Sequence, residues 1–366
     1  MNREPLTRRQ MLKTAAFLGA AGGVALLTHA ADGPPAVRST DDMITPDTES
    51  AINRGLEFLA SSQAADGSFS GERGGGANVG VTALAALALL SGGHQPGKGK
   101  FGRTVSKAAD YIIGRGKANT PSGFLCTSAQ SDGHSAMYQH GFGALFLAEL
   151  HGTFPDEDHR GKTRDMLERA VALTISAQNG KGGWRYNTKP SDDDVSVSVA
   201  HLMALRAAKN AGVMIDKAVV DKAVGYIKSC QTTEGGYSYM PGAGPEAFPR
   251  SAAAVVGLYC AGVYDGTHVE KGLKYLLRHI PAGQRATFQE FRQDHYFYGH
   301  YYAALAMWTA GGNYWAQWFP AIRNELLKKR EQNNVWRDDA FGNVYATALA
   351  CIILQLPNNY LPIMQK

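Results

Sequence analysis

The chain has 366 residues, a mean hydropathy of −0.24 and a formal net charge of +5 at pH 7. Lys and Arg form no stripe with interleaved aromatic residues, which argues against nucleic acid as a partner. Beyond the N-terminal leader, no stretch is apolar over the roughly 20 residues that a membrane-spanning helix needs. We therefore expect no transmembrane segment in the mature chain.

Residues 1–31 have the features of an export signal. Arg8 and Arg9 lie in the sequence Thr-Arg-Arg-Gln-Met-Leu-Lys, which resembles a twin-arginine signal, and a short apolar stretch follows. This leader carries a net charge of +3, so the +5 of the whole chain falls to about +2 after its removal. We expect export by the twin-arginine route to the periplasm or another extracytoplasmic compartment. Residues 32–48, with three prolines, are expected to be a linker, and residues 49–366 a single domain.

From Ser50 onward, the sequence repeats a pair of helices about every fifty residues. The first helix of each pair is amphipathic, with charged residues along one side. Each of these first helices can be marked by one core residue: Phe58, Tyr111, Leu173, Tyr226, Tyr275 and Leu326.

The second helix of each pair is rich in Ala and Gly and is apolar nearly all round, which is typical of a buried helix. One pair cannot bury its apolar face alone, so the pairs must stack on each other. We predict an all-α fold, an (α/α)6 toroid with six inner helices inside six outer ones. The expected inner helices cover residues 79–93, 140–152, 197–212, 251–262, 299–312 and 343–356.

A Gly-rich turn with a Gln and, six residues later, an aromatic residue follows several outer helices. The pairs are Gln63 and Phe69, Gln178 and Trp184, and Gln231 and Tyr237, with a degenerate copy at Gln332 and Trp336.

The turn with Gly-Gly-Trp, followed by Ser-Val-Ser-Val and Leu-Met-Ala-Leu, resembles the prenyltransferase and squalene-oxidase repeat. That repeat occurs in squalene–hopene cyclases, oxidosqualene cyclases and the β subunits of protein prenyltransferases. The likeness spans residues 50–356 and is greatest to the C-terminal half of squalene cyclases. It implies a terpenoid-cyclase toroid whose cavity holds an isoprenoid or another apolar ligand. It also implies a structural role for Gln178, whose amide ties an outer helix to a neighbouring aromatic ring, and for Trp184.

In such a toroid the inner helices run in one direction, so their N-terminal ends gather on one rim. Unpaired N–H groups and helix dipoles meet there and favour anions and polar groups. The residues that open the inner helices are therefore the candidates for the site. Those that we expect to bind a ligand are Tyr138, His140, Asp192, Arg250, Tyr298, His300 and Tyr301.

Three consecutive carboxylates give the sharpest chemical hypothesis. Squalene–hopene cyclases protonate an alkene with the middle Asp of an Asp-x-Asp-Asp motif that also follows Gly-Gly-Trp and opens an inner helix. Here the order is Ser191-Asp192-Asp193-Asp194-Val195, so Ser replaces the first Asp and Val the usual following Thr. The resemblance implies that Asp193 or Asp194 is the catalytic acid, because a carboxyl among other carboxylates can keep its proton. The alternative is that Asp194 only caps the helix and the other two are solvated.

The rim histidines and tyrosines leave further alternatives open. His140 and His300 with an Asp would suit zinc, but the Asp-x-Cys element of protein prenyltransferases is absent, and we expect neither a metal nor a cofactor. Tyr298 and Tyr301 could contact an isoprenoid chain or a carbocation, stack on sugar rings, or simply pack.

Two functions follow from these patterns. One is an exported enzyme acting on an isoprenoid or another apolar substrate in the toroid cavity. The other is a non-catalytic binding or scaffold protein of the cell envelope. A full squalene cyclase has two toroid-like domains, whereas this chain has room for one, which argues against ordinary triterpene cyclisation.

Overall fold

The computed structural model describes residues 43–365 except 72–74, 130–132, 282–294 and 332–334. The expected export signal and most of the expected linker lie outside the described residues. Helix α3 (Pro46–Ser61) includes the last three residues of the expected linker, 46–48. Its N-cap Thr45 accepts a hydrogen bond from the backbone N–H of Thr48, and Pro46 occupies the first helical turn, where it leaves no bond unmade.

Twelve α-helices lie within the described residues, six outer and six inner. The outer helices are α3, α5 (Gly102–Ala118), α7 (Glu157–Ser176), α9 (Lys217–Ser229), α11 (Thr267–Leu277) and α13 (Gly312–Lys329). The inner helices are α4 (Val79–Ser91), α6 (Ala136–Glu149), α8 (Val195–Asn210), α10 (Phe248–Cys260), α12 (Tyr296–Ala310) and α14 (Gly342–Gln355). Short 3-10 helices are η1 (Gly133–Ser135), η4 (Leu356–Asn358) and η5 (Pro362–Met364).

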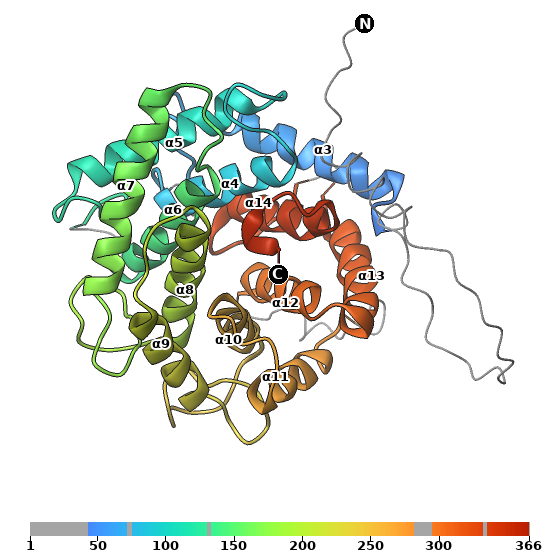
Figure 1. The fold of residues 1–366 in the computed structure, drawn as a ribbon. Coiled ribbons are helices and arrows are strands. Elements are labelled where there is room, and N and C mark those ends of the chain that lie inside the picture. The colour runs from blue at the N-terminus through green and yellow to red at the C-terminus, as the bar shows by residue number, and fades with distance from the viewer. Residues whose placement is uncertain (1–42, 72–74, 130–132, 282–294, 332–334, 366) are drawn as a thin grey trace, which may run out of the picture. The chain divides into compact units, whose positions relative to one another are not determined.

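The inner helices form a closed ring. Each contacts the next, and α14 contacts α4, while the outer helices surround them (Figure 1). Residues 43–365, where described, contain isolated β-bridges but no strand. The predicted (α/α)6 toroid is therefore confirmed.

Burial separates the two kinds of helix as their sequences predict. All 13 residues of α4 are buried, whereas only 4 of the 13 residues of α9 are. An inner helix is covered by neighbours on every side, so it needs small and apolar residues all round. An outer helix buries one stripe and leaves its charged face in water.

The Gln of each turn ties that turn to the next outer helix. The Gln178 side-chain amide donates to the carbonyl oxygens of Gly182 (3.0 Å) and Val219 (2.9 Å), the latter in α9. Gln63 and Gln231 repeat this pattern. The partners are thus backbone carbonyls, not the aromatic ring that the family resemblance implied.

Trp184 locks the turn onto both helices of its own pair. Its ring is 0% exposed, and its Nε1–H donates to the carbonyl oxygen of Thr174 in α7 (2.7 Å). Its backbone N–H donates to the hydroxyl of Ser198 in α8 (2.9 Å). Gly182 has a φ of +98°, and a Cβ there would lie 2.3 Å from the Lys222 carbonyl oxygen. Only glycine therefore fits this position.

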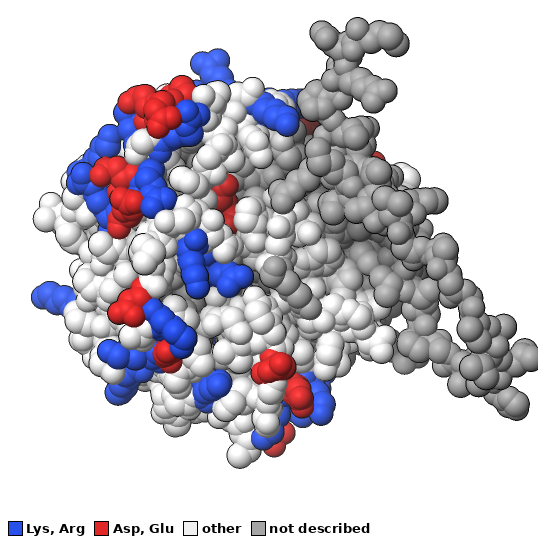
Figure 2. Space-filling model, viewed as in Figure 1, with Lys and Arg blue, Asp and Glu red and all other residues white. Residues whose placement is uncertain are grey.

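The surface carries charges of both signs. On the face in Figure 2, acidic and basic side chains lie intermingled, mostly over the outer helices.

The C-terminal helix η5 contacts the inner helices α8 and α12, and the Trp308 Nε1–H donates to the Met364 carbonyl oxygen (2.9 Å). No helix in the described part of the chain is both long and apolar enough to cross a membrane.

Candidate functional site

A cavity of about 610 Å³ lies at the end of the ring where the inner helices begin. This volume is within the usual range for small-molecule sites. The N-cap residues of all six inner helices line it: Asn78, Ser135, Asp194, Ala247, His295 and Phe341.

The wall becomes more apolar and aromatic one turn into the helices. Val81, Leu84 and Phe142 contribute apolar surface, and the rings of Tyr138 and Tyr298 line the cavity beside them. Such a wall accommodates an apolar ligand and leaves polar contacts to the rim.

The helix ends around the rim differ in how they are capped. The side chains of Asn78 and Asp194 accept hydrogen bonds from backbone N–H groups in the first turns of α4 and α8. The N-cap side chains of α6, α10, α12 and α14 make no such bond. Their dipoles therefore add positive potential at the cavity mouth.

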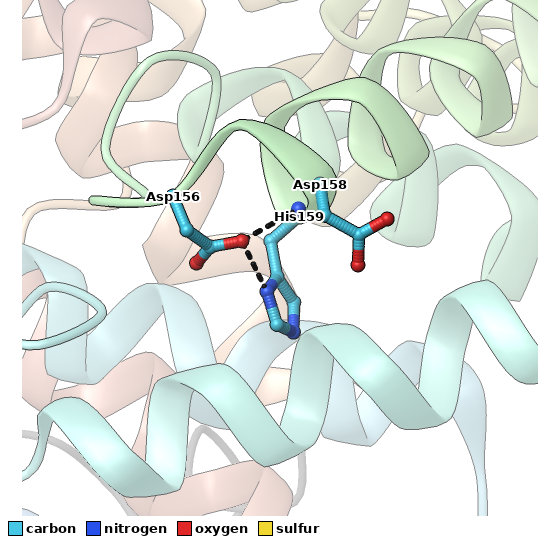
Figure 3. Close-up of side chains that lie close together, drawn as sticks. All are labelled: Asp156, Asp158 and His159. Atoms are coloured by element: carbon cyan, nitrogen blue, oxygen red, sulfur yellow. Dashed lines mark hydrogen bonds and ion pairs between the residues drawn. The ribbon is translucent and has the colours of Figure 1, made fainter.

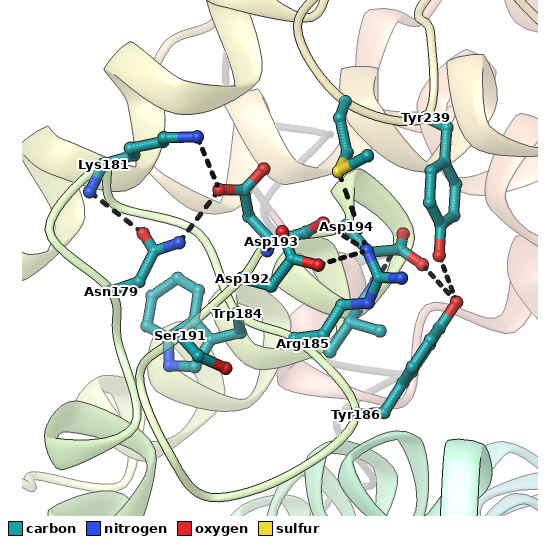
Figure 4. A network of polar contacts seen from close by, with 12 residues as sticks. Asn179, Lys181, Trp184, Arg185, Tyr186, Ser191, Asp192, Asp193, Asp194 and Tyr239 are labelled. Atoms are coloured by element: carbon teal, nitrogen blue, oxygen red, sulfur yellow. Dashed lines mark hydrogen bonds and ion pairs between the residues drawn. The ribbon is translucent and has the colours of Figure 1, made fainter. Parts of the chain in front are cut away.

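Asp194 is the one carboxylate among the described lining residues, and it is 1% exposed (Figure 4). Its Oδ1 accepts the backbone N–H groups of Ser196 (2.7 Å) and Val197 (3.4 Å), and its Oδ2 accepts the hydroxyl of Tyr186 (3.0 Å). Burial raises the pKa of Asp194 above its ordinary value, although these hydrogen bonds oppose the shift.

Tyr186, Tyr239 and Arg185 lie next to Asp194. The Tyr186 hydroxyl makes a short contact with the Tyr239 hydroxyl, and both rings line the cavity. The Arg185 guanidinium lies over both rings, 4.6 Å from the centre of Tyr186 and 5.2 Å from that of Tyr239. It also donates to the Asp193 carbonyl oxygen (2.8 Å), which fixes the turn that carries the acids.

The three carboxylates of the motif point in different directions (Figure 4). Asp193 is 1% exposed, but it does not line the cavity; its Oδ2 accepts from the Asn179 side-chain amide (2.9 Å) and lies 3.7 Å from the Lys181 Nζ. It is therefore buried, not solvated as the helix-cap alternative supposed. Asp192 is 52% exposed and forms an ion pair with Arg185 (3.3 Å) outside the cavity lining.

The other candidate residues divide into two groups. Tyr138, Arg250 and Tyr298 line the cavity. His140, His300 and Tyr301 do not, although each sits near the start of an inner helix.

Packing explains why the two histidines lie outside the cavity lining. The His140 ring is enclosed: its Nδ1 accepts the backbone N–H of Leu125 (3.1 Å), and its Nε2 lies 3.1 Å from the Thr174 hydroxyl. Burial lowers the pKa of His140 to about 4 and that of His300 to about 3. His300 packs against the rings of Phe248 (5.0 Å) and Tyr296 (4.4 Å). Both imidazoles are therefore neutral packing groups at neutral pH.

Tyr301 is 3% exposed and packs edge-to-face on Tyr302, with ring centres 4.9 Å apart. Of the two candidate tyrosines in this helix, Tyr298 and Tyr301, only Tyr298 lines the cavity.

Among the described residues, the side chains that could bind a metal ion together lie outside the cavity. Asp156, Asp158 and His159 form one group with converging ligand atoms, at the exposed start of α7 (Figure 3). Asp156 is the N-cap of that helix and accepts from both the backbone N–H (2.9 Å) and Nδ1 (2.7 Å) of His159. Helix capping accounts for this arrangement. Among the residues that the structure describes, neither His140 nor His300 belongs to a three-ligand group, so the zinc alternative gains no support.

Tyr186 and Tyr239 are site residues that the helix-start argument missed. They lie in turns before α8 and α10, not at the helix starts. A signal was present in the repeat register, because each stands two residues after the repeat's aromatic residue, Trp184 or Tyr237.

Comparison with known proteins places the chain in a family. The model of the prenyltransferase alpha-alpha toroid domain matches residues 36–125 and 121–279. Drimenyl diphosphate synthase of Streptomyces showdoensis is 27% identical over 213 residues, which cover 57% of this chain and 36% of that protein. The match thus spans about a third of the relative's length.

Solved structures share the fold at low sequence identity. The type II terpene cyclase MstE from Scytonema superposes with a TM-score of 0.58 and 16% identity, covering 87% of this chain and 100% of that one. A variant of it in complex with its substrate, geranylgeranyl dihydroxybenzoate, gives the same score over 86% and 98% of the two chains. An α-1,6-mannanase from a Salegentibacter species reaches 0.61 at 9% identity, over 86% and 99%.

Terpene cyclisation and mannan hydrolysis thus occur on the same architecture, and the likeness to solved structures establishes the fold alone. The family model, by contrast, covers more than half of the chain. The chain belongs to the prenyltransferase alpha-alpha toroid domain family.

Proposed function

We propose that the protein is a terpenoid-cyclase-like enzyme that takes an isoprenoid or similarly apolar polyene into the cavity and protonates it from Asp194. The observation that carries this proposal is a buried carboxyl in the wall of a largely aromatic and apolar cavity. A general acid needs access to the substrate and a raised pKa; Asp194 lines the cavity, and burial shifts its pKa in that direction.

The proposed chemistry begins when the Asp194 carboxyl gives its proton to one carbon of a double bond. The π electrons of that bond form the new C–H bond, and the second carbon becomes a cation that the next double bond attacks. The rings of Tyr138 and Tyr298 line the same cavity and would stabilise the cation through their π faces. Loss of a proton from the last cation forms a new double bond and completes the cycle, so that the product carries the same charge as the substrate.

The acid in this proposal is the helix cap itself. In the register of the squalene–hopene cyclase motif, the catalytic middle Asp corresponds to Asp193, which contacts Asn179 outside the cavity. We therefore assign the proton to Asp194 and not to Asp193.

That departure from the motif also supports the alternative, a non-catalytic binding or scaffold protein of the cell envelope. In that case Asp194 and Arg250 would only anchor a ligand's polar end. We also propose that the protein is exported, on the basis of the Arg8–Arg9 signal alone.

Turnover assays separate these readings. The purified protein is incubated with farnesyl diphosphate, geranylgeranyl diphosphate and squalene, and cyclic products are sought by gas chromatography and mass spectrometry. Asp194→Asn keeps the cap, because Asn is an equally good N-cap, and should lower turnover by about 100-fold or more. Asp193→Asn should retain turnover if it folds.

The opposite pattern, with Asp193→Asn inactive and Asp194→Asn active, would contradict the assignment. If the parent turns over none of the three compounds but binds one of them, and Asp194→Asn weakens that binding, the protein is a binder.

A further inference from the structure

We propose that the hydroxyl groups of Tyr186 and Tyr239 form a two-residue relay that returns a proton to Asp194 after each catalytic cycle. This inference rests on the proposed function, since only an acid that is consumed has to be reloaded. It assigns positioning and proton-transfer roles to two residues outside the acidic motif.

The two oxygens of the Asp194 carboxyl are not equivalent. Oδ1 accepts hydrogen bonds from the backbone N–H groups of Ser196 and Val197. These two groups can only donate, so they occupy the lone pairs of Oδ1. Oδ2 faces the Tyr186 hydroxyl, which can either donate or accept. The exchangeable proton therefore belongs on Oδ2, on the side of the tyrosines.

Water reaches this carboxyl poorly, because Asp194 is 1% exposed. The Tyr186 hydroxyl lies 3.0 Å from Oδ2 and contacts the Tyr239 hydroxyl, and both tyrosines are half-buried. Two hydroxyls thus lead from the enclosed oxygen to a residue that water can contact.

The rings are held so that the hydroxyls stay in line. The Arg185 guanidinium covers both rings, and the His134 ring stacks on Tyr186 with centres 4.6 Å apart and planes at 28°. The backbone carbonyl of Tyr239 accepts the N–H of Val195 (3.1 Å), which joins its turn to the first residue of α8. A relay needs this fixed geometry, because proton transfer falls off steeply with donor–acceptor distance and misalignment.

The proposed step balances in atoms and charge. After the substrate takes the Oδ2 proton, Asp194 is a carboxylate. The Tyr186 O–H bond then breaks as its proton bonds to Oδ2, the Tyr239 proton moves to the Tyr186 oxygen, and Tyr239 takes a proton from water. The hydroxide left behind is neutralised by the proton that the last cation releases, and no oxidant or reductant is involved.

Burial raises the pKa of the Tyr186 phenol and that of Tyr239, which makes a free tyrosinate costly. The two transfers therefore occur together, so removing either hydroxyl should slow the relay.

The test compares the first turnover with the steady state, using whichever compound of the panel above the parent cyclises. Tyr239→Phe keeps the ring and removes the outer hydroxyl. In Tyr239→Phe the ratio of steady-state turnover to first turnover should fall about tenfold, because only the steady state requires Asp194 to be reloaded. Tyr186→Phe should lower the same ratio; its first turnover also changes, because the Tyr186 hydroxyl contacts Asp194 Oδ2 directly. Tyr264→Phe, on a 40% exposed tyrosine, is the matched control and should change neither rate. Equal losses in both phases would show a structural role, and unchanged steady-state turnover would also overturn the relay.

A second measurement does not depend on turnover. The infrared band of the protonated Asp194 carboxyl, identified by its loss in Asp194→Asn, is followed after transfer to D2O at mildly acidic pH. Exchange should be slower in Tyr239→Phe and Tyr186→Phe than in the parent and in Tyr264→Phe. Equal exchange in all four would refute the relay. A parent that exchanges through the tyrosines but cyclises nothing would refute the proposed function instead.

Discussion

Replacing Trp184 with Ala should lower the free energy of unfolding by about 3–5 kcal/mol, the usual cost of truncating a buried Trp. The ring is 0% exposed, so the truncation leaves a void between α7 and α8. It also removes the Nε1–H bond to the Thr174 carbonyl, whose net contribution is about 1 kcal/mol and is part of that total. The Thr174 carbonyl keeps a second donor in the Ala177 N–H (3.3 Å), so no acceptor is left unpaired.

The assay is urea unfolding followed by circular dichroism. Trp184→Phe is the matched control: it keeps most of the ring but loses the N–H donor, so it should cost only about 1–2 kcal/mol. The backbone N–H bond to the Ser198 hydroxyl is available in both variants. If Trp184→Ala unfolds like the parent but no longer binds ligand, the ring belongs to the binding site and its assignment as a structural residue is wrong.

Three further predictions concern the turn, the buried imidazoles and export. Gly182→Ala should destabilise the protein by more than 1 kcal/mol, because the φ of Gly182 is positive and a Cβ there would lie 2.3 Å from a carbonyl oxygen. Gly180→Ala is the control: it has open space around it and should be nearly neutral in urea unfolding. Stability should fall by up to about 3 kcal/mol as pH drops from 6.5 to about 4, because the unfolded state protonates His140 first; a flat pH series would contradict its burial. Replacing Arg8 and Arg9 with Lys should leave precursor inside the cell, and unchanged export by fractionation would refute the twin-arginine signal.

The fold could be predicted because the helix-pair repeat is visible in the sequence. Six helix pairs with near-constant spacing allow few architectures, and inner helices such as α4 are apolar on every side because every side is covered. The position of Asp194 at a helix start could also be predicted, because Asp is a favoured N-cap residue and α8 begins directly after it.

The side-chain directions within the site could not be predicted. Asp193 and Asp194 are adjacent in sequence, yet one contacts Asn179 and the other lines the cavity, because the capping geometry turns them apart. His140 opens an inner helix as predicted, but its ring lies against α7, where it meets Thr174. The position of a residue along its helix can be predicted from the sequence. The direction in which its side chain points depends on how neighbouring repeats pack against it.

The pairing of Tyr186 with Tyr239 shows the same limit. The two residues are 53 positions apart, and their hydroxyls meet because consecutive turns of the toroid lie side by side. The repeat register places Tyr186 and Tyr239 at equivalent positions, but it does not predict that both rings point toward Asp194.

The central claim, that Asp194 starts a cyclisation by protonating the substrate, is tested most directly by running the reaction in D2O. A cyclic product formed by protonation should carry one deuterium, at the carbon that received the proton, because the relay supplies Asp194 from solvent. The parent should give this labelled product, and Asp194→Asn should give about 100-fold less or none. A cyclic product without deuterium, or a labelled product formed equally well by Asp194→Asn, would contradict the claim.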